Sequence, residues 1–583
     1  MSVHRELIIL CALMLAPQGS TQPVFIPEWP RVGPYSAADM CSNCHDATDV
    51  GVEPAIMRAP DPALPSVPDP DGHNISPMLG QKAGVMGHTM NDPYFTAVVD
   101  DEVSYFPDLD GQIENECLRC HAPMGFDYAH GYNPAALDED GYYRLDTAVS
   151  EMHAREGVSC TLCHQIQIDP NVELANGTRI VGDDSILFGP IADPVRTRMA
   201  RYGVEYSEAI SDSALCGSCH NLFTIVLNPD TGDPTGERFL EQGSWFEWRN
   251  SVFAEGGGTT CQDCHMATPG VSFQTPVSTY NAPPARAGYS PHLNPGGNTQ
   301  LLEMLRQYRI DLGLDPLLTD GEFQVAMETT QEYLKQAAAL LLAVDGRPGV
   351  LIVDATILNL TGHKLPTGYP ARRMWLHMRV TDDAGATVFE SGAPDPDGRL
   401  PSDAAETAAA CTAQSKPDGF DSAVCYSPHR DLIDDPDQVA VYESVMSDAN
   451  DNITYVLLSG RGYLKDNRIP PVGFTASGEH FLPETAVVGI GSDADFNVDG
   501  SGQDTVHYRV PVIDTDGPFT VEARLLYQSV RPAFVSVLTA DTQRVNDYRS
   551  YYVAVPPQPE LLAEASAVAA IEIVFFDGFE IGP

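Results

Sequence analysis

Five copies of one short pattern, Cys-x-x-Cys-His, constrain this chain more than any other feature of its sequence. They use ten of the thirteen cysteines and begin at Cys41, Cys117, Cys160, Cys216 and Cys261. A chain of this composition would contain roughly 0.01 copies by chance, and the pattern is that of c-type haem attachment. A structural zinc site would require each cysteine pair to find a second pair, and it gives histidine no reason to follow every time.

The spacing of the pattern matches the covalent chemistry of the haem. Each thiol forms a thioether with one former vinyl group of the macrocycle, and the adjacent imidazole becomes the proximal ligand of the iron. The sequence therefore predicts five covalent haems. The attachment residues are Cys41, Cys44, His45, Cys117, Cys120, His121, Cys160, Cys163, His164, Cys216, Cys219, His220, Cys261, Cys264 and His265.

The second axial position of each iron decides between an electron carrier and an enzyme. A second protein ligand saturates the iron, whereas an open position admits a substrate. Met86 and His88 share one short segment, so we expect one of them to ligate. Only residues 154–159 separate His153 from Cys160, so we expect His153 to bind a neighbouring haem rather than that of His164. The candidate distal ligands are Met86, His88, His130, His153, His292 and His363.

The chain is strongly acidic, with 33 Lys and Arg against 81 Asp and Glu and a formal net charge of −48. This balance argues against nucleic acid or an anionic membrane as a partner and favours basic proteins, cations or mineral surfaces. Adaptation to high salt would explain the same composition.

The N-terminus, residues 1–20, is typical of a secretory signal peptide. Arg5 precedes an apolar run, Leu7 to Ala16, that is too short to span a bilayer, and no other run reaches transmembrane length. A lipoprotein signal has a small residue before its cysteine, whereas Cys11 follows the bulky Leu10. This argues against lipidation of Cys11. Because bacterial c-type haem attachment takes place outside the cytoplasm, we expect a protein that is periplasmic or exported to the cell surface.

Composition and hydrophobic pattern divide the rest of the chain into four parts. Residues 21–300 are rich in Pro, Gly and Asp, which predicts a multihaem domain of short helices and loops. A linking region, 301–347, contains a predicted helix over 320–344. Residues 348–556 predict an antiparallel β-sandwich, and 557–583 form a tail whose apolar end, 571–583, is either an edge strand or a secretion tag. The expected strands are 350–360, 374–380, 387–390, 439–446, 453–458, 505–512 and 519–527.

Two cysteines, Cys411 and Cys425, remain once the haem motifs and Cys11 in the signal are set aside. In an exported chain such a pair favours a disulfide, and the alternative is two buried free thiols.

A short acidic segment resembles the start of a calcium-binding loop. Asp495, Asn497 and Asp499 occupy the first, third and fifth positions, and Gly500 follows at the sixth. Position 12 is Val506 rather than glutamate, although Asp504 could substitute. The alternative is an acidic turn between two strands.

The chain contains several longer characteristic segments. Over 80–300 these are NDPYF, CLRCHAPMGF, EGVSCTLCHQI, LFGP, EWRNS and SPHLNPGGN, and the β-rich C-terminal half adds GHKLPTGYPARR and KDNRIPPVGF. These segments resemble those of exported multihaem c-type cytochromes related to the tetrahaem cytochromes of hydroxylamine oxidation. The resemblance implies an axial ligand at the place of Met86. It also implies electron transfer more than catalysis, because the chain lacks the CxxCK motif of pentahaem nitrite reductases.

Three functions are compatible with this sequence. The first is electron transfer through a chain of five haems, with partners such as other cytochromes or quinol-linked donors. The second is an oxidoreductase with one five-coordinate haem that acts on a small nitrogen or sulfur compound. The third is a subunit of an extracellular cytochrome filament. Four convincing distal ligands for five irons would favour the enzyme.

Overall fold

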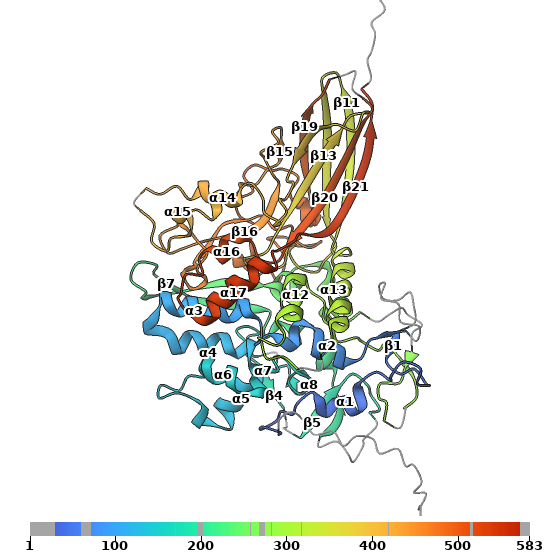
Figure 1. Ribbon diagram of the computed structural model, residues 1–583, viewed down its shortest axis with the longest axis vertical. Coiled ribbons are helices and arrows are strands. Elements are labelled where there is room, and N and C mark those ends of the chain that lie inside the picture. The colour runs from blue at the N-terminus through green and yellow to red at the C-terminus, as the bar shows by residue number, and fades with distance from the viewer. Residues whose placement is uncertain are drawn as a thin grey trace, which may run out of the picture.

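A computed structural model describes residues 30–571, apart from 60–71, 170, 183–184, 195–201, 257, 268–273, 281–282, 316–317, 418 and 514–516. The predicted signal peptide and the tail beyond residue 571 lie outside this range. Short helices occupy the lower part of the molecule in Figure 1, and long strands rise above them. No helix among the described residues is both long and apolar enough to cross a lipid bilayer.

The region that contains the five motifs is built from short helices and two-stranded ribbons. Prolines and glycines divide it, and several helices begin at a proline in the first turn, where its missing N–H costs no hydrogen bond. The helices are α1 (Asp39–His45), α2 (Pro77–Ala83), α3 (Pro93–Tyr105), α4 (Asp110–His121), α5 (Pro123–Gly131), α6 (Leu145–Ser150), α7 (Met152–Arg155), α8 (Cys160–Cys163), α9 (Ala214–Gly217), α10 (Ser244–Arg249) and α11 (Cys261–His265). The strand pairs are β1 (Arg58–Ala59) with β2 (His73–Asn74), β3 (Ile166–Gln167) with β4 (Ile180–Val181), β5 (Ile186–Gly189) with β6 (Gly203–Tyr206), β7 (Asn221–Leu227) with β8 (Pro234–Gly243), and β9 (Gln274–Thr275) with β10 (Arg286–Ala287).

Two helices, α12 (Thr299–Tyr308) and α13 (Asp320–Leu334), connect this region to the sheets. The predicted helix over 320–344 begins correctly, with a capping box between Thr319 and Glu322, but its second half is wrong. Residues 338–347 instead form strand β11 (Ala338–Arg347), which pairs along its whole length with β12 (Val350–Asn359). Strand pairing overrides the helix propensity of this alanine- and leucine-rich segment.

The C-terminal half contains two sheets. One has the order β11-β12-β19-β15, and the other has the order β17-β16-β13-β20-β21, with β14 and β18 attached to β13 and β16. All pairs are antiparallel except β15 with β19, so the predicted purely antiparallel arrangement is wrong at that edge. The remaining strands are β13 (Arg373–Thr381), β14 (Thr387–Ser391), β15 (Leu432–Ile433), β16 (Val441–Ser447), β17 (Ile453–Thr454), β18 (Gly462–Asp466), β19 (Gln503–Pro511), β20 (Phe519–Gln528) and β21 (Glu560–Ala569).

The two sheets share one apolar core. Leu351 and Val353 of β12 and Tyr508 of β19 pack in it with Leu376 of β13 and Val521 of β20, and all five are fully buried. Burial alternates along β12, as expected for a strand with one face on the core. Strand β21, which pairs with β20 along nearly its whole length, lies in the part predicted as a tail, because its alanines and glutamates carry no strand signal.

A helical segment within the predicted β region packs on the motif-containing region instead. It comprises α16 (Pro532–Ser536) and α17 (Gln543–Ala554). Val545 and Tyr548 of α17 share a buried cluster with Ala97 of α3 and Met304 of α12, and α17 lies beside α3 in Figure 1. The two halves of the chain therefore have a common core at their junction.

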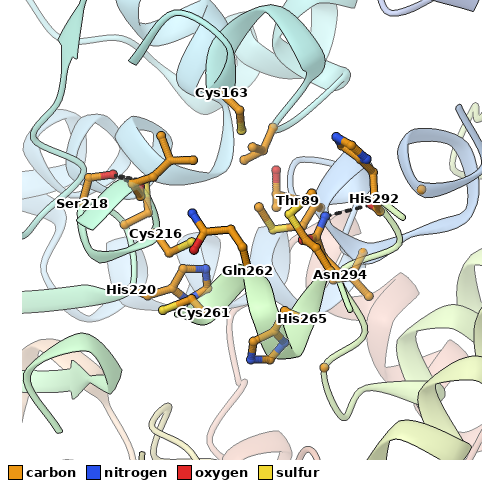
Figure 2. Close-up of a pocket in the computed structure, with 18 of the residues that line it drawn as sticks. Thr89, Cys163, Cys216, Ser218, His220, Cys261, Gln262, His265, His292 and Asn294 are labelled. Carbon is orange, nitrogen blue, oxygen red and sulfur yellow. Dashed lines mark hydrogen bonds between the residues drawn. The ribbon is translucent and has the colours of Figure 1, made fainter. Parts of the chain in front are cut away.

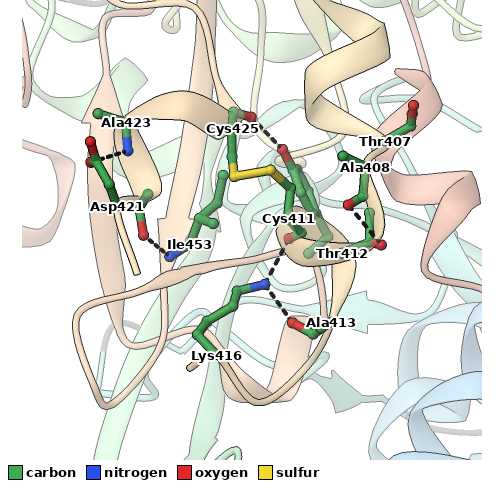
Figure 3. Close-up of a disulfide and its surroundings, with 12 residues drawn as sticks. Thr407, Ala408, Cys411, Thr412, Ala413, Lys416, Asp421, Ala423, Cys425 and Ile453 are labelled. Atoms are coloured by element: carbon green, nitrogen blue, oxygen red, sulfur yellow. Dashed lines mark hydrogen bonds between the residues drawn. A yellow bond between two sulfur atoms is a disulfide. The ribbon is translucent and has the colours of Figure 1, made fainter. Parts of the chain in front are cut away.

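The predicted disulfide is confirmed. Cys411 and Cys425 are bonded, with their Cα atoms 5.5 Å apart, and both are buried (Figure 3). The Tyr455 hydroxyl donates a hydrogen bond to the Cys425 carbonyl at 3.1 Å. The disulfide cross-links the long connection between β14 and β16, which has little regular structure.

We expect the Cys411→Ala/Cys425→Ala double variant to lose about 3 kcal/mol of unfolding free energy, the value for a loop of this length. Urea unfolding followed by far-ultraviolet circular dichroism measures it. Wild-type protein treated with a thiol reductant is the control and should match the variant. Equal stability of the variant and the untreated wild type would contradict a structural role for this bond.

Candidate multihaem site

Each of the five motifs lies in or directly beside a short helix. The first is in α1, the second forms the end of α4, and the third and fifth coincide with α8 and α11. The fourth begins in α9 and continues in the turn after it, where the His220 amide donates to the Cys216 carbonyl at 3.0 Å. Residues at i, i+3 and i+4 of a helix project from the same face. A helical turn therefore aims both sulfurs and the imidazole of each motif in one direction, which is the arrangement that one macrocycle needs.

All fifteen attachment residues line a single continuous cavity of about 2780 Å³. A pocket for one small ligand occupies roughly 300–1,000 Å³, so this space has room for several macrocycles. Figure 2 shows part of it, where Cys163, Cys216 and Cys261 lie around the same space as His220, His265 and His292. Five pairs of thiols, each with an adjacent imidazole, are the donor set that covalent haem requires.

Four of the five proximal histidines have their Nδ1 atom engaged with a backbone carbonyl. A carbonyl only accepts, so Nδ1 carries the hydrogen and Nε2 keeps a free lone pair. Histidines that bind metals are oriented in this way by an outer hydrogen bond. The pairs are His45 with Val277 at 2.7 Å, His121 with Thr89 at 3.1 Å, His164 with Phe188 at 2.6 Å and His265 with Pro295 at 2.9 Å.

Burial also keeps these imidazoles neutral, which ligation to a metal requires. Desolvation lowers the pKa of His121 and of His220 to about 4. It also lowers the pKa of His45, His164 and His265 from the ordinary value.

Two of the predicted distal ligands lie opposite proximal histidines. The ring centroids of His164 and His292 are 6.3 Å apart with 20° between the ring planes, and those of His265 and His363 are 6.4 Å apart with 23°. Two imidazoles on one metal, each about 2.0 Å from it and about 1.1 Å from nitrogen to ring centre, would have centroids about 6.2 Å apart. With this separation, each pair of imidazoles would be able to hold one iron between them.

Met86 and His88 are separated by the fold, although they are only two residues apart. Met86 lines the cavity. His88 is buried outside it, and its Nε2 donates to the Lys82 carbonyl at 2.6 Å. Of the two candidates in this segment, Met86 alone is placed to reach an iron.

His130 and His153 are not among the described side chains that line the cavity. The Nε2 atom of His130 donates to Asn115 Oδ1 at 3.0 Å. His153 is buried against the ring of Tyr128, and its Nε2 lies 3.2 Å from a carboxylate oxygen of Glu151. The structure places His292, and not His153, opposite His164. The side chains of His130 and His153 thus pair with neighbouring protein groups, and the spacing of the sequence did not indicate these pairings.

A buried ionic network holds the loop that carries His363. The Lys364 amide donates to Glu247 of α10 at 2.9 Å, and the Lys364 ammonium lies 2.6 Å from Asp466. Arg468 bridges Asp466 and Glu247 at 2.7 and 3.1 Å. Although burial alone would raise it, the charges of Arg468 and Lys364 lower the pKa of Asp466 to about 2. The network was missed in the sequence because its members come from three distant segments.

Close packing fixes the same loop against α10. A Cβ atom on Gly362 would lie 2.9 Å from Cδ1 of Trp248, so only glycine allows this approach without a shift. Asn359 at the end of β12 donates to the His363 carbonyl at 2.8 Å. The loop after β12 thus places His363, from the C-terminal half of the chain, at the wall of the cavity.

A second group that sequence reasoning missed lines the cavity near the second motif. Burial raises the pKa of Glu102 and of Glu241 to about 8. Tyr94 and Tyr369 share a hydrogen bond of 2.9 Å on the same wall. The two carboxyl groups can hold or release protons near neutral pH, whereas burial raises the pKa of both tyrosines further above it.

The predicted calcium loop is not assembled as its pattern suggested. Asn497 Oδ1 accepts from the Gly502 amide at 2.9 Å, and Asn497 Nδ2 donates to the Phe474 carbonyl at 3.1 Å. Asp499 is exposed. Asp495 alone of the three lies in a group of potential metal ligands among the described residues.

No protein-family model matches this chain, and no curated protein does. Among solved structures, a penta-heme cytochrome c552 from Thermochromatium tepidum is similar, with a TM-score of 0.41 and 17% sequence identity. The similarity covers 78% of this chain and 83% of that one.

Proposed function

We propose that this protein binds five c-type haems in one cavity and transfers electrons between them. The convergence of all fifteen attachment residues on a single space supports this function. The haems, when bound, supply five one-electron iron couples. The chain contributes the thioether anchors, the oriented imidazoles and a common enclosure that keeps the five sites adjacent.

Contacts between cysteines of different motifs suggest an order for the five sites. Cys41 and Cys160 lie within hydrogen-bonding reach of each other, as do Cys120 and Cys219, and Cys216 and Cys261. Cys163 also interacts electrostatically with Cys219. The first site therefore lies beside the third, and the fourth lies beside the second, the third and the fifth. This is a connected, branched path for electrons.

The sites of the third and fifth motifs have two histidines each. His164 and His292 would saturate one iron, and His265 and His363 would saturate another. Saturated irons favour outer-sphere electron transfer over substrate binding. The C-terminal half would then serve as a ligand donor and cover for the fifth site, in addition to any role in docking redox proteins.

The compartment and partners in this proposal follow from the chemistry of attachment and from the charge. The protein would be periplasmic or exported to the cell surface. It would exchange electrons with other cytochromes or quinol-linked donors, and its net charge of −48 favours a basic contact surface on those partners.

Mass spectrometry of protein matured with a c-type haem assembly system tests the proposal. Wild-type protein should carry five haem increments. The Cys160→Ser/Cys163→Ser variant should carry four, whereas the matched Cys411→Ser/Cys425→Ser variant should keep five. Fewer than five haems on the wild type would show that one motif is not used.

A second candidate function, oxidoreduction of a small nitrogen or sulfur compound, is favoured by the number of histidines. Five irons have ten axial positions, and seven histidines line the cavity in the described part of the chain. Met86 could fill one of the other three positions. Glu102 and Glu241 would supply protons beside the second motif. Electron paramagnetic resonance of the oxidised protein separates the functions, because a high-spin signal that a small ligand abolishes favours the enzyme.

A further inference from the structure

A group of carboxylates lies at the seam between the two sheets, far in sequence from the haem motifs. Ligand atoms of His429, Asp493 and Asp504 lie within 4.8 Å of one another, and so do those of Asp431, Asp495 and His507. Asp493 and Asp495 interact directly, which joins the two sets into one cluster. Nothing in the proposed electron-transfer function uses these residues.

One member of the cluster is buried with an unsatisfied oxygen. Asp504 in β19 is 1% exposed, and its Oδ2 accepts from the Tyr442 hydroxyl of β16 at 2.6 Å. Its Oδ1 has no hydrogen-bond donor, and the same holds for the buried Oδ1 of Asp495. Buried polar atoms are nearly always paired, because an unpaired one forfeits its hydration. Two unpaired carboxylate oxygens in one cluster point to a missing positive partner.

For Asp493 and Asp504, the described basic side chains do not provide that partner. No described lysine or arginine forms an ion pair with either of them, and His429 is the ion-pair partner found for Asp493. His507 instead pairs with Asp354, Asp431 and Asp495. Carboxylates this close repel each other unless a proton or a cation neutralises them. The cluster is therefore built for a bound positive charge.

His429 orients the cluster but is not available as a ligand. Asn467 Nδ2 donates to His429 Nδ1 at 3.0 Å, and the same amide is held by Val441 and Glu443 backbone groups at 2.9 and 3.0 Å. Nδ1 must therefore accept, so Nε2 carries the hydrogen and donates it to Asp493 Oδ2 at 2.7 Å. His429 is a positioning residue for Asp493.

We infer that Asp493 and Asp504, two buried carboxylates of one ligand group, bind one hard divalent cation of the Ca²⁺ class, with Asp495 adjacent to Asp493. With His429 engaged, the remaining donors are carboxylate oxygens, which Ca²⁺ prefers to nitrogen. Asp504 comes from one sheet and is held by Tyr442 of the other, so the cation would join the two sheets. The half-exposed His507 beside Asp495 marks the side that opens to solvent and to coordinating water.

The test uses the full, haem-loaded protein after treatment with a chelator. Calcium chloride is titrated in by isothermal calorimetry, and the melting temperature is recorded with and without it. Wild-type protein should bind one Ca²⁺ and melt at a higher temperature when it is bound. Asp504→Asn should weaken binding at least tenfold and remove the rise. Asp493→Asn is the second variant, in case Asp504→Asn does not fold.

Asp499→Asn is the matched control, because Asp499 belongs to the same loop but is exposed and outside the cluster. It should bind Ca²⁺ as the wild type does. The inference fails if the wild type binds no Ca²⁺ at millimolar concentration, in which case Asp504 keeps a proton, since burial raises its pKa to about 7. It also fails if only Zn²⁺ binds and His429→Gln abolishes that binding. In both of these outcomes the haem spectrum should be unchanged, so the failure of the cation inference would leave the electron-transfer proposal standing.

Discussion

Replacing His363 by alanine should convert one of the five irons from low-spin to high-spin. His363 lies opposite His265 with ring centroids 6.4 Å apart, and no other described histidine is paired with His265 in this way. Loss of the imidazole would leave an open or water-bound position on that iron. Electron paramagnetic resonance and the optical spectrum of the oxidised protein should report one additional high-spin centre, with all five haems still covalently attached.

His292→Ala should have the same effect on a different iron, that of His164, and the double variant should show two additional high-spin centres. His130→Ala is the control, because His130 is hydrogen-bonded to Asn115 and does not line the cavity. It should leave the spectrum unchanged. A spectrum unaltered by loss of His363, or altered by loss of His130, would show that the ligand assignment is incorrect.

Asp466→Ala should lower the free energy of unfolding by about 3–5 kcal/mol, the cost of removing one partner from a buried ion pair. Asp466 is fully buried, and its loss would leave Lys364 and Arg468 without their shared counter-charge. Because Lys364 directly follows His363, we also expect part of the fifth site to become high-spin. Denaturant unfolding and the oxidised spectrum measure the two effects in the same sample.

Arg461→Ala provides the comparison for that variant. Arg461 pairs with Glu237 at 2.7 Å, but the two side chains are 41% and 50% exposed. Exposed pairs contribute about 0–1 kcal/mol, so this variant should be close to wild type in both stability and spectrum. If Asp466→Ala were equally mild, the network would not be what holds the His363 loop.

These two predictions assign the C-terminal sheets a direct part in the redox site. His363 follows β12, and its loop is anchored on α10, which leads towards the fifth motif. A sheet region that only docked a partner would have no need to insert a histidine into the cavity. The proposed fifth site would therefore depend on both halves of the chain being folded together.

Several strands could be predicted from the sequence because their patterns are local. Residues 350–359, 373–381, 503–511 and 519–528 form strands close to the predicted ranges. The errors occur where composition and pairing disagree. Ala338–Arg347 and Glu560–Ala569 are rich in alanine, leucine and glutamate, yet both are ten-residue strands because a neighbouring strand pairs with each of them.

The sequence by itself was enough to predict which residues would attach haems and to predict the disulfide that the structure contains. The thioether chemistry requires two cysteines and a histidine at fixed positions within one helical turn, so the requirement is visible in five consecutive residues. The disulfide followed because Cys411 and Cys425 were the two cysteines left outside the motifs and the signal, and the structure bonds them.

Only the tertiary structure showed which distant side chains lie beside the predicted attachment residues. His292 and His363 lie opposite His164 and His265, over a hundred and almost a hundred residues away in sequence, whereas the nearer His153 pairs with Glu151. The calcium-like pattern led to Asp495, but the fold groups its carboxylate with Asp431 and His507 and leaves Asp499 in solvent. An axial ligand or a cation donor is defined by its position in space, and distant segments reach that position only when the core brings them together.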